Sequence, residues 1–219
     1  MKYKNYIWDF DGTLFDSYPH ICECLLQILE REGIRDNFDA EMVMRYLCVS
    51  YGAARDYTGI TKEAYRDFVD LQYVTGENEV EPKVVPYDDC EKVLREIMLC
   101  GGRHFLYTHR NMTAVEHIAN FGMSDCFVDR VTSEDKFPSK PAPNAIQALI
   151  DRNQLDPAET IMIGDREIDG KSGKNAGIDG ALVNYYPRLP DGTSPADVSE
   201  MDYVAGSLTE LWEMLRNAE

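Results

Sequence analysis

Two aspartates stand two residues apart near the start of the chain, directly after a short apolar run. Asn5-Tyr6-Ile7-Trp8 has the composition of a buried strand, and Asp9 and Asp11 follow it. Side chains alternate along a strand, so the two carboxylates would share a face if the strand continued to Asp11. Gly12 then lets the backbone turn sharply. Such a pair can hold a hard cation, attack an electrophile or move a proton, although an ordinary Asp-rich turn has the same composition.

Three later segments also carry polar residues that could do chemistry. Thr108 follows the apolar run at 104–107, and a Thr hydroxyl with backbone N–H groups at a helix start can bind an anion or cap the helix. Lys140 stands before Pro141, where it is either a site cation or a solvated lysine that precedes a helix. Gly164-Asp165 follows the apolar run at 161–163, with Asp169 four residues after Asp165. Asp169 would by itself suit a helix N-cap.

The arrangement of strands and helices predicts that these segments meet. After residue 88 short apolar strands alternate with helical patterns, which is typical of a parallel sheet covered on both faces. Right-handed crossovers place the carboxyl ends of such strands at one edge, where ligands bind. We therefore predict an α/β fold with a Rossmann-like parallel sheet core. The expected strands are 5–8, 104–107, 127–131, 160–163, 180–183 and 203–205, and the expected helices are 88–100, 112–121, 144–153, 169–176 and 207–215. Asp88 with Glu91 predicts a capping box at the first of these helices.

Residues 17–82 have a different pattern, with one helical repeat after another and no strand. Helices are expected near 19–33, 39–47, 53–57 and 61–76. The segment 15–19 and the proline-containing segment 82–86 then serve as stiff connections on either side. We predict a catalytic core formed by 1–16 and 83–219, with an inserted α-helical cap domain at 17–82.

The composition limits the possible partners. The chain has 219 residues and a net charge of −17, which disfavours nucleic acid and anionic membrane as partners. An anionic substrate would need a local positive site, which a metal ion can supply. No apolar stretch approaches the roughly 20 residues that span a bilayer, and no secretory signal opens the chain. The six scattered cysteines indicate reduced, buried thiols and a cytoplasmic protein.

Together, the four segments resemble the four motifs of the haloacid dehalogenase superfamily, in its cap-in-first-loop branch of phosphoglycolate phosphatase-like proteins. Asp9-x-Asp11-Gly12-Thr13 is similar to the first motif, Thr108 to the second, Lys140 with its Pro to the third, and Gly164-Asp165 with Asp169 to the fourth. Relatives often have Asn or Gly where His109 stands. We expect His109 to be a surface histidine rather than a catalytic base.

The resemblance implies a role for each of these residues. Asp9 would be the nucleophile and Asp11 the general acid and base, while Thr108 and Lys140 would hold the phosphate. Mg²⁺ would be bound by the Asp9 carboxylate, by Asp165 and by the backbone carbonyl of Phe10 or Asp11. Asp169 would support the site by orienting Lys140 or a metal-bound water. The other residues expected to support the site are Gly12, His109 and Gly164.

The expected activity is Mg²⁺-dependent hydrolysis of a small phosphate monoester through an aspartyl-phosphate, by an enzyme that acts as a monomer on a small phosphorylated metabolite. A phosphomutase of the β-phosphoglucomutase type would share every catalytic residue and is the alternative. A non-catalytic protein that binds a phosphorylated ligand is a third reading, but it predicts a broken motif. Arg45, Tyr51 and Arg55 in the insert are candidates for selecting the substrate, because a second anionic group would need a cation.

Overall fold

A computed structural model describes residues 1–73, 83–186, 198–199 and 201–218. The chain forms two compact units. The first comprises Met1–Phe15, Pro86–Tyr185 and Ala196–Glu219, and the second comprises Asp16–Val85 and Tyr186–Pro195. Phe15–Asp16 (β2) and Val85–Pro86 (β3), which lie in the two segments that we expected to connect the core and the insert, pair as a two-stranded sheet.

The first unit is built on a six-stranded sheet in the order β5-β4-β1-β6-β7-β8, and every neighbouring pair is parallel. This confirms the predicted α/β class with a parallel sheet. The central strands are short and buried on both faces, which is why they read as apolar runs rather than as alternating patterns. The strands are β1 (Asn5–Trp8), β4 (Arg103–Tyr107), β5 (Phe127–Val131), β6 (Thr160–Gly164), β7 (Asp179–Val183) and β8 (Tyr203–Ala205).

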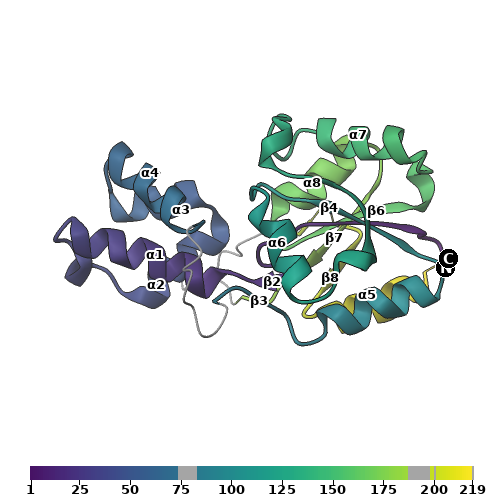
Figure 1. Ribbon diagram of the computed structural model, residues 1–219, viewed down its shortest axis with the longest axis horizontal. Helices are drawn as coiled ribbons and strands as arrows, with labels where there is room; N and C mark the ends of the chain where they lie inside the picture. The colour runs from purple at the N-terminus through teal and green to yellow at the C-terminus, as the bar shows by residue number, and fades with distance from the viewer. Residues whose placement is uncertain (74–82, 187–197, 200, 219) are drawn as a thin grey trace. The chain divides into compact units, whose positions relative to one another are not determined.

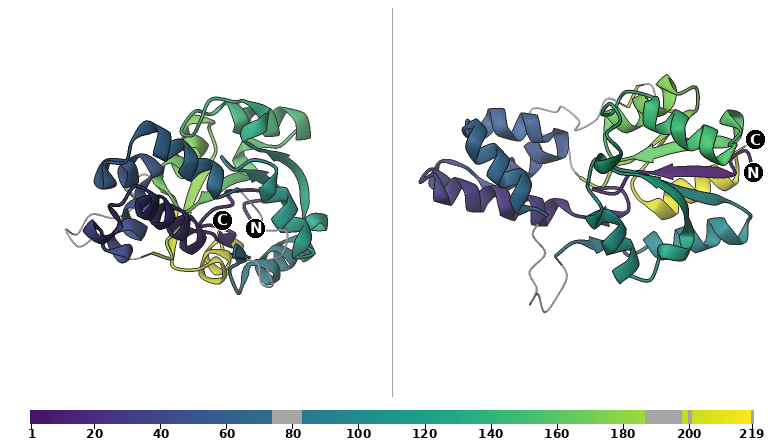
Figure 2. Two further views of the ribbon diagram at one scale, coloured as in Figure 1. Left: turned by 60° about the vertical axis from the view of Figure 1, so that its left-hand side comes forward. Right: turned by 45° about the horizontal axis from the view of Figure 1, so that its top comes forward.

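Helices cover both faces of this sheet (Figures 1 and 2). α7 (Asn144–Asn153) and α8 (Glu167–Asn175) pack on one face, and α5 (Cys90–Leu99) and α9 (Leu208–Arg216) pack on the other. α6 (Thr113–Asn120) follows β4 in the chain. Ile7 of β1 belongs to the cluster that includes Leu149 of α7. Tyr6 points to the opposite face, where its ring lies edge-on to Trp212 of α9.

A neutral histidine ties β1 to α5 inside this core. The Trp8 indole N–H donates to His104 Nδ1 at 2.9 Å, and His104 Nε2 donates to the Leu94 carbonyl at 2.9 Å. Burial lowers the pKa of His104 to about 4, because a charged imidazole would lose its hydration there. The ring therefore stays neutral at neutral pH, as the Trp8 hydrogen bond to Nδ1 requires.

The second unit is helical in its described part. Its helices are α1 (Tyr18–Arg31), α2 (Ala40–Val49), α3 (Tyr51–Thr58) and α4 (Lys62–Leu71). The side chains of Asp39, Ser50 and Thr61 cap α2, α3 and α4 by accepting backbone N–H bonds. The fourth helix ends at Leu71 rather than near Gly76, which lies outside the described residues. Short 3-10 helices that we did not predict occupy Arg35–Asn37, Ser124–Cys126, Ser133–Asp135 and Pro157–Glu159.

The predicted capping box at Asp88 and Glu91 is wrong. α5 begins at Cys90, and the residue before it, Asp89, makes no cap to its own helix. The Asp89 carboxylate instead accepts from the backbone N–H and the hydroxyl of Thr209, both at 2.8 Å, at the start of α9. Asp89 thus bonds to a distant helix, and no side-chain cap forms at the start of α5.

Two further expectations concern the cysteines and the membrane. All six cysteines lie in described segments; they form no disulfide, and only Cys100 is exposed. The search of the described helices finds none with the length and apolar content that crossing a bilayer requires.

Candidate active site

Four loops of the first unit meet at the carboxyl edge of the sheet. Asp9 follows β1, Thr108 follows β4 and Asp165 follows β6, so all three side chains leave neighbouring strands at the same edge. The backbone N–H of Asp9 still donates to Ile163 of β6 at 2.8 Å, which anchors the first loop to the sheet. Lys140, on the loop before α7, reaches the same place.

Lys140 is completely buried between two aspartates. Its ammonium lies 2.9 Å from Asp9 Oδ1 and 2.7 Å from Asp169 Oδ1, and it also donates to the Tyr107 carbonyl at 3.0 Å. The three charged side chains are 0–2% exposed. Buried charges persist only when they are paired, so this triad is a strongly constrained unit. The resemblance implies that Asp169 orients Lys140 or a metal-bound water, and the structure places Asp169 within ion-pair distance of Lys140.

The two aspartates of the triad differ in basicity. Burial raises the pKa of Asp9 to about 6, against the opposing attraction of Lys140. Burial also acts to raise the pKa of Asp169, but Lys140 and Arg166 together outweigh it, and the pKa of that carboxyl falls below its ordinary value. Burial by itself would lower the pKa of Lys140, whereas the two carboxylates raise it above its ordinary value. Lys140 is therefore a permanent cation paired mainly with Asp169.

This arrangement leaves Asp9 with an available oxygen. Asp9 Oδ2 is buried and has no hydrogen-bond partner among the described residues. Asp169, by contrast, uses its second oxygen to accept the Arg166 backbone N–H at 3.0 Å, which makes it an N-terminal cap of α8 as well as a partner of Lys140. Its two possible roles, a cap and a site residue, are thus compatible.

The donor set fits a hard divalent cation. Carboxylate oxygens of Asp9, Asp165 and Asp169 lie within 4.8 Å of one another. Because both oxygens of Asp169 are already engaged, Asp9 and Asp165 are the natural ligands. Of the two carbonyls proposed as a further ligand, that of Phe10 accepts three backbone N–H groups of its own loop. The carbonyl of Asp11 is therefore the better candidate.

Two glycines allow the loops to approach this closely. A Cβ on Gly164 would lie 2.2 Å from the Asp169 Cβ atom, so only glycine fits between β6 and α8. Gly12 has a φ of +74°, a left-handed conformation that turns the chain directly after Asp11. Gly173 of α8 similarly lies close to Met162 of β6.

Asp11 has a partner that the sequence did not suggest. The Arg110 guanidinium donates to Asp11 Oδ1 through Nε at 3.0 Å and through a terminal nitrogen at 2.7 Å. Arg110 is 1% exposed and lies over the Phe10 ring at 5.5 Å. Arg110 was not among the predicted site residues. The signal that could have revealed it is a basic residue two positions beyond Thr108, at the sheet edge where the aspartates gather.

His109 is not the surface histidine that we expected. It is partly buried, and its Nε2 accepts the Lys140 backbone N–H at 3.0 Å, which joins the second loop to the third. Burial, followed by the positive charge of Lys140, lowers the pKa of His109 to about 4. The neutral ring is therefore an acceptor rather than a base. Thr108 is buried, and its hydroxyl oxygen accepts the Arg110 N–H at 3.0 Å.

The three candidate substrate residues belong to the second unit and have partners within it. Arg45 pairs with Glu41 at 2.5 Å, and the Tyr51 hydroxyl donates to Gln72 Oε1 at 2.6 Å. Arg55 pairs with Asp56 at 2.7 Å. Their role in substrate selection stays a prediction.

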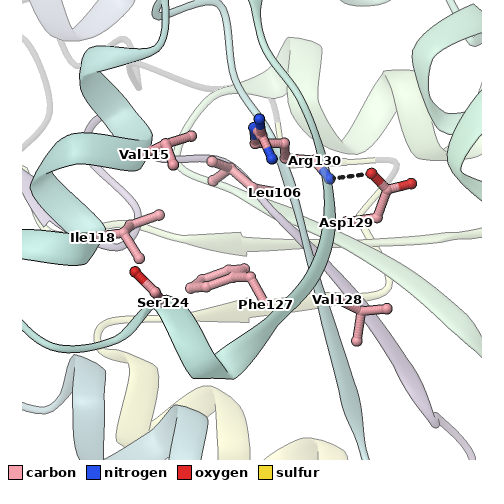
Figure 3. A pocket seen from close by; sticks show the side chains of 8 residues that line it. All are labelled: Leu106, Val115, Ile118, Ser124, Phe127, Val128, Asp129 and Arg130. Atoms are coloured by element: carbon pink, nitrogen blue, oxygen red, sulfur yellow. Dashed lines mark hydrogen bonds between the residues drawn. The ribbon is translucent and has the colours of Figure 1, made fainter.

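The described part of the first unit contains several cavities, and two of them can be compared with the predicted site. One of about 200 Å³ lies against β5 and α6, is lined by Leu106, Ile118 and Phe127 among others, and contains none of the predicted site residues (Figure 3). A smaller one of about 130 Å³ is lined by Thr108, His109 and Ser139 and so adjoins the site.

Comparison with known proteins can now be set beside this geometry. The family model described as haloacid dehalogenase-like hydrolase matches residues 6–183. The chain belongs to this family. The expectation of a hydrolase of the haloacid dehalogenase superfamily is thereby confirmed, and the matched range includes all four loops.

Individual relatives agree with the family match. A phosphoglycolate phosphatase from Vibrio parahaemolyticus is 28% identical over 221 residues, covering 95% of this chain and 94% of the relative. Pyrophosphatase PpaX from Bacillus velezensis is 25% identical over 210 residues, with 94% and 93% covered. A hydrolase from Streptococcus pneumoniae TIGR4, known as a crystal structure, has 29% identity and a TM-score of 0.62, with 84% of this chain and 94% of that chain covered.

Proposed function

We propose that this protein is a Mg²⁺-dependent phosphatase that hydrolyses a small, phosphoglycolate-like phosphate monoester through an aspartyl-phosphate on Asp9. One observation carries the proposal: Asp9 is a buried carboxylate at the end of the central strand, with Lys140 on one oxygen and no hydrogen-bond partner on the other. A nucleophile needs such a combination of orientation and available electrons. A structural ion pair would have both oxygens engaged.

In the first step Asp9 Oδ2 attacks phosphorus, and the bond from phosphorus to the ester oxygen breaks. Asp11 gives its proton to the departing alcohol. Lys140, the Thr108 hydroxyl and backbone N–H groups of the loops hold the phosphate oxygens, so that the charge that moves during transfer faces fixed positive groups. His109 contributes indirectly, because its bond to the Lys140 N–H holds the third loop in place.

In the second step water attacks the phosphorus of the aspartyl-phosphate. Asp11 takes a proton from this water, and the electron pair of the breaking P–O bond returns to the Asp9 carboxylate. Asp169 keeps Lys140 in position through both steps, by the 2.7 Å ion pair. The order of events returns every group of the chain to its starting state.

Asp9, Asp165 and the Asp11 carbonyl would hold the Mg²⁺ ion. Bound there, the ion would reduce the repulsion between an anionic nucleophile and an anionic substrate. The close approach of the Asp9 and Asp165 carboxylate oxygens, which lie with Asp169 within 4.8 Å of one another, supports this assignment.

Relatives that carry the names phosphoglycolate phosphatase and pyrophosphatase PpaX support a small phosphorylated substrate. We further propose that residues 17–82 form a cap, and that Arg45, Tyr51 and Arg55 select the substrate from it. The absence of disulfides among the six cysteines supports a cytoplasmic location.

The test is phosphate release from a panel that contains phosphoglycolate, pyrophosphate, glycerol phosphate, sugar phosphates and nucleotide monophosphates. Wild-type protein and Asp9→Asn are compared, each with Mg²⁺ and with a chelator. The proposal expects release only from wild type with Mg²⁺, and the preferred compound identifies the substrate. Equal release by both proteins, or none by wild type across the panel, would refute it.

A further inference from the structure

Arg110 makes a two-pronged ion pair that no part of the catalytic scheme above uses. Its Nε and one terminal nitrogen both donate to Asp11 Oδ1, at 3.0 and 2.7 Å, and Nε also lies 3.2 Å from Asp11 Oδ2. A fork of this kind fixes the plane of the carboxylate as well as its position.

The surroundings hold Arg110 itself in place. Its backbone N–H donates to the Thr108 hydroxyl at 3.0 Å, and its carbonyl accepts from Ser133 at 3.1 Å. The guanidinium is almost fully buried and lies over the Phe10 ring. A side chain so constrained on both its backbone and its head group is a rigid support. Asp11, whose side chain is 17% exposed, is the more exposed member of the pair.

We propose that Arg110 is a positioning residue that orients the Asp11 carboxylate for its work as the base of the second step. The inference rests on the proposed function. In that step the water oxygen bonds to phosphorus, the bond from phosphorus to Asp9 breaks with its electron pair returning to Asp9, and one water proton passes to Asp11. The Arg110 fork holds the carboxylate in the single orientation that this proton transfer needs.

An aryl phosphate separates this role from a general structural one. Nitrophenolate leaves without a proton, so the first step with 4-nitrophenyl phosphate does not need Asp11. The second step needs it with every substrate. A misplaced Asp11 should therefore slow hydrolysis of the aspartyl-phosphate and leave its formation unchanged. For such a mechanism kcat and KM fall together, and kcat/KM, which reports only the steps through formation of the intermediate, stays the same.

The experiment uses Arg110→Met, which removes the charge, and Arg110→Lys, which keeps the charge but loses the fork. The matched control is Arg103→Met, because Arg103 also makes a two-nitrogen contact, to the Asn5 side chain, but outside the site. Steady-state and rapid-mixing kinetics are measured with 4-nitrophenyl phosphate and Mg²⁺. Folding of each variant is checked by urea unfolding.

We expect Arg110→Met to lose about 10- to 100-fold in kcat with kcat/KM within about twofold of wild type. Rapid mixing should show a burst of one nitrophenolate per active site, which marks accumulation of the intermediate. Arg110→Lys should lie between wild type and Arg110→Met, and Arg103→Met should match wild type. In an Asp11→Asn background, Arg110→Met should add little further loss, because both changes remove the same function.

Three outcomes would overturn the inference. A fall of kcat/KM equal to that of kcat would show that Arg110 binds substrate or supports the whole site. Additive losses in the double variant would show that it acts independently of Asp11. If Arg110→Met does not fold, Arg110→Lys decides alone, and wild-type kinetics from that variant would overturn the proposal. A wild-type protein with no activity on the aryl phosphate or on any compound of the substrate panel would instead refute the proposed function, which distinguishes the two failures.

Discussion

Replacing the proposed nucleophile should make the metal-free protein more stable. Asp9 is 2% exposed, and burial raises its pKa from an ordinary 3.8 to about 6. Below pH 3.8 the carboxyl is protonated in both the folded and the unfolded chain, and its ionisation has no effect on folding. As the pH rises from 3.8 through 6, the carboxyl ionises more readily in the unfolded chain than in the folded chain. The free energy of unfolding therefore falls over this range, by about 3 kcal/mol in total.

Asp9→Asn avoids this loss of stability and removes few favourable contacts. Lys140 would keep the 2.7 Å ion pair with Asp169 and the bond to the Tyr107 carbonyl. We therefore expect Asp9→Asn to unfold with a free energy up to about 3 kcal/mol higher than wild type near pH 7.5 in a chelator, and the difference to disappear towards pH 4.

Urea unfolding followed by tryptophan fluorescence measures this difference, since Trp8 and Trp212 both lie in the first unit. Asp151→Asn on the exposed side of α7 is the control and should change stability by less than about 0.5 kcal/mol. The reasoning fails if Asp9→Asn is no more stable than wild type near pH 7.5. It also fails if the gain is the same at acid pH, because the gain would then not come from ionisation.

Three other changes test the remaining parts of the site and core. Asp165→Asn should weaken Mg²⁺ binding by at least about 10-fold, measured calorimetrically on metal-free protein, and unchanged affinity would remove Asp165 from the ligand set. Lys140→Met should lower the free energy of unfolding by about 3–5 kcal/mol near pH 7.5, with a smaller loss at acid pH where Asp9 is protonated; a loss independent of pH would contradict the triad. Because burial lowers the pKa of His104 from 6.5 to about 4, its contribution to stability is complete above pH 6.5 and falls by about 3 kcal/mol as the pH decreases to 4. His104→Gln should flatten this part of the urea stability profile, and an unchanged profile would contradict a neutral buried ring.

The sequence predicted the sheet and the meeting of the four loops because both follow from local patterns. Each central strand has four or five residues and includes a short apolar or aromatic stretch, and Asp9, Thr108 and Asp165 come directly after these strands. Once the strands are parallel, their carboxyl ends share an edge, so no long-range information is needed to gather these residues.

Pairings between side chains from different loops could not be predicted in the same way. Arg110 pairs with Asp11 across 99 residues, and His109 bonds to Lys140 across 31. The place of Arg110 two positions beyond Thr108 could have drawn attention to it, but the local pattern does not identify the partner of Arg110 or of His109. The capping box at Asp88 failed for the same reason, since Asp89 bonds to Thr209 of a helix 120 residues away. Contacts between side chains of distant segments can be identified only once the three-dimensional structure is known.

Detection of the phosphorylated enzyme tests the central claim most directly. Wild-type protein is mixed with 4-nitrophenyl phosphate and Mg²⁺, quenched in acid within the first turnover, digested, and its peptides are analysed by mass spectrometry, with Arg110→Met as the variant in which the intermediate should persist. The account predicts one phosphoryl group on the peptide that contains Asp9, absent from Asp9→Asn. A phosphoryl group on any other residue, or steady turnover by Asp9→Asn, would contradict it.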